Sequence, residues 1–167
     1  MTVPMALMDF VPVLLFGAAW VILYKDLKNK LDLCSGVLLP LGAVMVFVAG
    51  FLKAVWKMQK ALGVNAVELF NKAMFPTQSI GFMLLAVGML AGLVYIARKM
   101  KVKAAIPIFI VTFVVLMMMG YLSSRDFGQA SANWIAQSVN TLGQGLLLFG
   151  TILLHKAGLA DPDALKK

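Results

Sequence analysis

The sequence predicts an all-α integral membrane protein, a single domain built as a bundle of five transmembrane helices. Of the 167 residues, 62% are hydrophobic and only 13% are charged, and the mean hydropathy is +0.92. A soluble domain of this length could not bury so much apolar surface. Five apolar stretches with short connections occupy almost the whole chain, so one domain is expected. The expected spans are 3–24, 34–60, 75–97, 104–122 and 131–155, with a polar, disordered tail at 160–167.

The first span is expected to remain in the protein, because no Lys or Arg precedes its apolar stretch as a signal peptide would require. Its one charged residue in the apolar part is Asp9. One interpretation starts the helix at Phe10 and leaves Asp9 as a solvated flank. The other buries this carboxylate, which then needs a partner such as Lys53 or Lys57, because an unpaired charge inside a span is destabilising.

The second span ends in three lysines, Lys53, Lys57 and Lys60, spaced so that they share one helix face. The same face carries small residues, Gly42, Ala49 and Gly50. Small residues mark the side on which membrane helices approach closely, which favours a lysine face that points into the bundle. The alternative is that the lysines snorkel to the lipid headgroups, as lysines at span ends often do.

The third span is expected to begin at Phe75 and Pro76, because proline is well tolerated in the first turn of a helix. The segment before it, residues 61–74, could form a short interfacial helix. Gly88 and Gly92 form a GxxxG pattern, which predicts close helix packing either inside the bundle or in a dimer.

The fourth span is almost wholly apolar, with Pro107 in its first turn, where a missing N–H is tolerated. The fifth span differs, because its polar residues recur on one face within roughly 60° of arc. These are Asn133, Gln137, Asn140, Gln144, Thr151 and His155. A side-chain amide in hydrocarbon must find a partner, so this stripe should face protein or water rather than lipid. It could line a cavity, or it could hold neighbouring helices together.

Alternating spans bring polar groups from several helices to one membrane face. Their charges balance to a mildly basic vestibule, which suits a small polar or anionic solute or a lipid headgroup. The candidate ligand-binding residues are Asp9, Lys53, Lys57, Gln78, Arg125, Asn133, Gln137, Asn140 and Gln144.

The distribution of basic residues predicts the orientation. The first and third loops and the C-terminal end together hold ten Lys and Arg, against five on the other side. The positive-inside rule then places the N-terminus outside and the C-terminus in the cytoplasm. The expected location is the plasma membrane. Four lysines do not follow this rule, because they lie on the side that should be poor in lysine: Lys53, Lys57, Lys60 and Lys72.

The chain offers little for catalysis. One histidine, one cysteine and the lack of HExxH, GxSxG or phosphate-loop motifs predict no metal centre, no cofactor and no enzymatic activity. The basic residues that give the chain its formal charge of +8 lie at span ends, so they indicate lipid headgroups as partners and not nucleic acid. The favoured function is binding or transport of a solute, with a homo-oligomer or a partner membrane subunit completing the path. The alternatives are a non-catalytic scaffold or regulatory subunit of a larger membrane complex and an intramembrane lipid-modifying enzyme.

Overall fold

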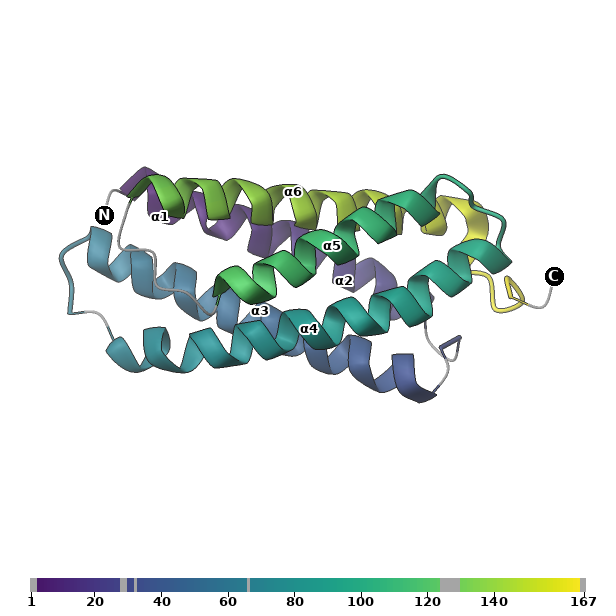
Figure 1. Cartoon of the computed structure of the whole chain (residues 1–167), viewed down its shortest axis with the longest axis horizontal. Coiled ribbons are helices and arrows are strands. Elements are labelled where there is room, and N and C mark those ends of the chain that lie inside the picture. The colour runs from purple at the N-terminus through teal and green to yellow at the C-terminus, as the bar shows by residue number, and fades with distance from the viewer. Residues whose placement is uncertain (1–2, 28–29, 32, 66, 124–129, 166–167) are drawn as a thin grey trace.

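The structure is a computed structural model that describes residues 3–27, 30–31, 33–65, 67–123 and 130–165. Throughout this part of the chain the regular structure is helical, without strands (Figure 1). The elements are α1 (Val3–Met8), α2 (Phe10–Asp26), α3 (Leu33–Ala61), α4 (Glu68–Lys99), α5 (Ala105–Ser123), α6 (Ala130–Leu154) and the π-helical turn η1 (His155–Leu159). Side chains are described for these residues apart from 70–75 and 122–133.

Four segments are long and apolar enough to cross a membrane: Val3–Asp26, Leu33–Ala61, Pro76–Lys99 and Trp134–Leu159. The first of them joins α1 and α2 end to end. α5 is a shorter apolar helix, over the described range Ala105–Tyr121. The all-α membrane bundle predicted from the sequence is confirmed.

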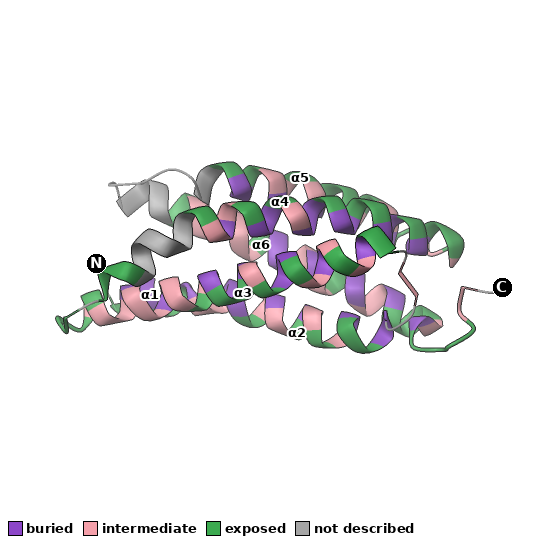
Figure 2. Cartoon of the chain, turned by 90° about the horizontal axis from the view of Figure 1, so that it is seen from below, coloured by how far each residue is buried: buried purple, intermediate pink, exposed green. Residues whose placement is uncertain are grey.

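The helices pack side by side in a ring, and the contact between α2 and α3 is the weakest in it. α3 packs along α4, α4 along α5, α5 along α6, and α6 along α2. α2 and α3 complete the ring but touch each other far less. Buried and exposed residues alternate along each helix (Figure 2), so each helix has one face packed against its neighbours and another face exposed. The loosely closed side between α2 and α3 leaves space for polar side chains.

The contact between α3 and α4 depends on glycines that bring the two backbones close together. A Cβ added at Gly42 would lie 2.6 Å from the backbone nitrogen of Leu85. A Cβ at Gly88 would lie 3.0 Å from Leu39. Gly92 likewise faces α3, where a Cβ would meet Ser35 at 3.1 Å. The GxxxG pattern therefore serves packing inside the bundle.

The start of α4 and the C-terminal tail differ most from the expectation. α4 begins at Glu68, so Pro76 lies inside the helix instead of at its start. The Glu68 carboxylate pairs with Lys60 at 2.7 Å, which ties the beginning of α4 to the end of α3 and places a negative charge in the first helical turn. The tail expected to be disordered instead forms turns up to residue 165, and Leu165 packs against the core.

Candidate functional site

The polar face of α6 points into the bundle. Gln144 is only 2% exposed, whereas Ile135, Leu142 and Phe149 on the opposite face are all exposed. The Gln144 amide nitrogen donates a hydrogen bond to the side-chain oxygen of Asn140 at 3.2 Å. The sequence-based expectation that this stripe avoids lipid agrees with this geometry.

Gln137, one turn before Asn140, contacts the backbone of the first helical segment. Its side-chain nitrogen donates to the Met8 carbonyl oxygen at 3.2 Å. This carbonyl lies four residues before Pro12, which has no N–H to donate to it. Pro12 thus leaves the Met8 carbonyl without a backbone donor at the junction of α1 and α2, and the Gln137 side chain of α6 donates to this carbonyl instead.

Asp9 and Lys57 form an ion pair inside the same end of the bundle. The Lys57 ammonium lies 2.5 Å from an Asp9 carboxylate oxygen, and each side chain is only 5% exposed. Asp9 is therefore a buried, paired carboxylate and not a solvated flank. Lys57 points into the bundle and does not snorkel, whereas Lys60 is exposed and pairs with Glu68.

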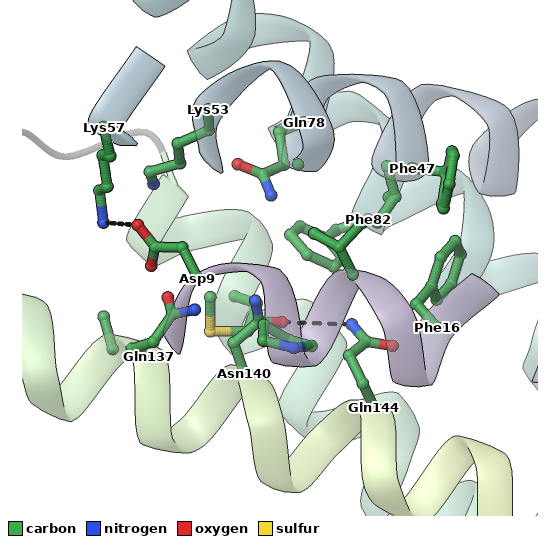
Figure 3. A pocket seen from close by; sticks show the side chains of 16 residues that line it. Asp9, Phe16, Phe47, Lys53, Lys57, Gln78, Phe82, Gln137, Asn140 and Gln144 are labelled. Carbon is green, nitrogen blue, oxygen red and sulfur yellow. Dashed lines mark hydrogen bonds and ion pairs between the residues drawn. The ribbon is translucent and has the colours of Figure 1, made fainter. Parts of the chain in front are cut away.

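These groups surround a cavity of about 50 Å³ between α2, α3, α4 and α6 (Figure 3). A volume of this size holds on the order of three water molecules. Its polar lining residues are Asp9, Lys53, Lys57, Gln78, Gln137, Asn140 and Gln144. Two lysines thus face one carboxylate among the described lining residues, so the lining is mildly basic.

Two buried amide oxygens in this lining lack a hydrogen-bond partner. They are the Oε1 atoms of Gln78 and Gln144, and no described residue donates to either of them. Gln78 is 5% exposed and comes from α4, on the far side of the cavity from α6. An unsatisfied buried acceptor costs about 1–3 kcal/mol, so the site favours an occupant that donates hydrogen bonds.

The cavity has a polar end and an apolar end. Lys53, Lys57 and Asp9 lie at one end, and Phe16 and Phe82 lie at the other (Figure 3). Both phenylalanine rings are almost fully buried. The polar lining therefore stops part-way through the bundle at an apolar layer.

A second polar pair lies beyond this layer, at the opposite end of the bundle. His155 Nδ1 and an Asp26 carboxylate oxygen are 2.7 Å apart, with Asp26 buried and His155 half exposed. Between the two ends, the Thr151 hydroxyl is buried and donates to the Leu147 carbonyl of its own helix at 2.8 Å. The five residues of the stripe whose side chains are described thus have different partners.

Seven of the nine predicted ligand-binding residues meet at this one cavity. The other two cannot be placed, because Arg125 and the side chain of Asn133 lie outside the described residues. Sequence reasoning missed the roles of Pro12 and of the apolar layer at Phe16 and Phe82. The four-residue spacing from Met8 to Pro12 was a usable signal, whereas nothing distinguishes these two phenylalanines in the sequence.

Within the described residues, no group of three or more His, Cys, Asp or Glu side chains could hold a metal ion. A comparison of the chain with protein-family models, with curated proteins and with solved structures found no match.

Proposed function

We propose that this protein binds a small polar solute in the cavity between α2, α3, α4 and α6, as the substrate site of a membrane transport or solute-binding system. The proposed location is the plasma membrane, with the N-terminus and the polar end of the cavity outside and the C-terminus in the cytoplasm. No catalytic step is part of the proposal.

The observation that carries the proposal is the pair of unpartnered amide oxygens, Gln78 Oε1 and Gln144 Oε1, in the lining of one cavity. Both are acceptors, so the solute should carry N–H or O–H donors. Lys53 and Lys57 also lie in this lining and make it suitable for a negatively charged or strongly polar group. A ligand that meets these atoms would remove the desolvation penalty of both amides at once.

The size of the cavity limits the solute. About 50 Å³ accommodates only a few non-hydrogen atoms, far below the 300–1,000 Å³ typical of sites for drug-sized ligands. The proposed occupant is therefore either a very small solute or the polar tip of a larger molecule such as a lipid headgroup. A homo-oligomer or a partner membrane subunit would be needed to extend the site into a path across the bilayer.

The test begins with gentle mass spectrometry of the purified protein, followed by denaturation, to identify a co-purified small molecule. The informative variants are Gln78→Met and Gln144→Met, which keep most of the side-chain volume and remove the amide. Ser138→Ala, on an exposed position of α6, is the matched control. We expect a ligand in the native protein and in the control, and its loss from both methionine variants.

The same variants give a second measurement on the ligand-free protein. If the oxygens are unsatisfied without a ligand, Gln78→Met should raise the melting temperature while it abolishes binding. If both methionine variants retained the ligand, the side-chain amides of Gln78 and Gln144 would not be part of the binding site. Co-purification of a membrane polypeptide and no small molecule would instead support the scaffold function considered from the sequence.

A further inference from the structure

A second and larger hollow lies at the opposite end of the bundle. It measures about 490 Å³ and is bordered by the segment that precedes α3, the last turns of α4 and the C-terminal segment. These three parts of the chain lie at the same end of the molecule (Figure 1). Its polar lining residues are Lys30, Tyr95 and Lys99, and its apolar ones include Ala91, Ile96 and Leu165.

The lining of this hollow is positively charged. Lys30 and Lys99 stand on opposite elements, and none of the described residues that line it is acidic. The Lys30 ammonium also donates a hydrogen bond to the Leu159 carbonyl, which positions it beside the C-terminal segment. Lys99 also borders a smaller hollow of about 220 Å³ that contains Asp161. The larger hollow is thus complementary to an anion.

The order of residues along α4 shows what kind of anion would fit. Ala91, Tyr95 and Lys99 follow i, i+4, i+8 spacing, so they lie on one helix face, and all three are exposed. Each step rises about 6 Å along the axis. The face therefore passes from a small apolar residue to an amphipathic ring and then to a cation. This is the order of acyl chain, interface and headgroup in a lipid leaflet.

A soluble anion would use the lysines but not the apolar part of the hollow. A phospholipid would use both, with its phosphate near Lys30 and Lys99 and the start of an acyl chain along Ala91. At the same end of the bundle, the last turns of α2 and α4 carry Lys25 and Arg98, and the connection to α5 carries Lys101 and Lys103. Basic clusters at a span end attract anionic lipid.

We propose that this hollow is a specific binding site for one anionic phospholipid, with the C-terminal segment as one of its walls through Leu165. This inference is independent of the solute proposed for the other cavity, because the two hollows share no lining residue. Bound lipid would also hold the C-terminal segment against the end of α4.

The experiment is native mass spectrometry of the full chain in detergent, titrated with dioleoyl phosphatidylglycerol and with dioleoyl phosphatidylcholine. The first variant, Lys99→Gln, removes one cation from the lining, and Lys103→Gln is its control because this exposed lysine lies outside the hollow. The second variant, Ala91→Phe, fills the apolar part without changing the charge. Val114→Phe, on an exposed position of α5, is the control for that substitution.

We expect phosphatidylglycerol to bind in preference to phosphatidylcholine, and Lys99→Gln to weaken its binding about five-fold, the factor expected for one lysine at a membrane surface. Ala91→Phe should weaken both lipids, while the two control variants should bind as the native protein does. sn-Glycerol 3-phosphate, the headgroup without chains, should not compete at millimolar concentration.

Three results would overturn the proposal. Equal affinity for the two lipids would show that the hollow does not select anionic lipid. An equal loss in Lys99→Gln and Lys103→Gln would reduce the effect to general surface charge. Competition by free glycerol phosphate at the affinity of the lipid would make the hollow a site for a soluble anion.

Discussion

The side-chain amide of Gln137 donates a hydrogen bond to the backbone carbonyl of Met8, 129 residues away, at 3.2 Å. The carbonyl is available because Pro12 cannot donate the helical hydrogen bond that would normally satisfy it. A proline in one helix and an amide in another are thus linked by a single acceptor. This link joins α6 to the junction of α1 and α2, where Asp9 enters the cavity.

The first prediction is a coupling between Pro12 and Gln137. Gln137→Leu should destabilise the protein by about 1 kcal/mol, because it leaves the Met8 carbonyl without its donor. In a Pro12→Ala background the alanine N–H can bond to that carbonyl, so the same substitution should have a much smaller effect. Thermal unfolding of the four proteins in detergent gives the coupling energy directly. Additive effects would show that the two residues do not share this acceptor.

The second prediction concerns the buried ion pair. Lys57→Met leaves the Asp9 carboxylate buried and uncompensated, which should destabilise the protein by about 3–5 kcal/mol. The double variant Asp9→Val with Lys57→Met removes both charges and should regain most of that stability. Lys60→Met is the control, because its exposed pair with Glu68 contributes under about 1 kcal/mol. A double variant less stable than Lys57→Met would contradict the pairing.

The third prediction tests the close contact between α3 and α4. Gly42→Ala would place a methyl group 2.6 Å from the Leu85 backbone nitrogen, and backbone atoms cannot move away as a flexible side chain can. The expected loss is about 1–3 kcal/mol. Gly145→Ala on α6 is the comparison, since nothing lies within 4 Å of its added Cβ. That substitution should stabilise its helix by about 0.5–1 kcal/mol.

The fourth prediction is that water reaches the residues lining the cavity less readily with increasing depth along α6. In a Cys34→Ser background, cysteines at positions 137, 140 and 144 should react with a water-soluble thiol reagent in decreasing order. Gln137 and Asn140 are half-buried, whereas Gln144 is almost fully buried. Leu142→Cys, on the outward face of α6, should remain unmodified in a bilayer.

Adding the thiol reagent to only one side of the membrane also tests the proposed orientation, in which position 137 reacts from outside. Reaction at 142 faster than at 137 would contradict a water-filled lining on the amide face of α6.

The helical membrane bundle and the helix face on which each polar residue lies can be predicted from the amino-acid sequence. These properties follow from local chemistry, because about twenty apolar residues are needed to cross a bilayer and the helical repeat sets side-chain direction. The amide face of α6 could therefore be predicted from the spacing of Gln137, Asn140 and Gln144 alone. The meeting of Asp9, Lys57 and Gln78 in one site was predicted from the convergence of polar groups at one end of the bundle, with Lys53 or Lys57 as the possible partner of Asp9.

The neighbour that each of these faces contacts depends on how the helices pack against one another. A lysine at a span end can snorkel or turn inward, and only the position of Asp9 at the junction of α1 and α2 explains why Lys57 lies inside while Lys60 stays exposed. A GxxxG face can serve a dimer or a bundle, and only the backbone of α3 assigns it to the bundle. The unpartnered oxygens of Gln78 and Gln144 likewise exist only where α4 and α6 face one cavity. Such choices depend on contacts between helices that are far apart in the chain, and a local repeat carries no information about them.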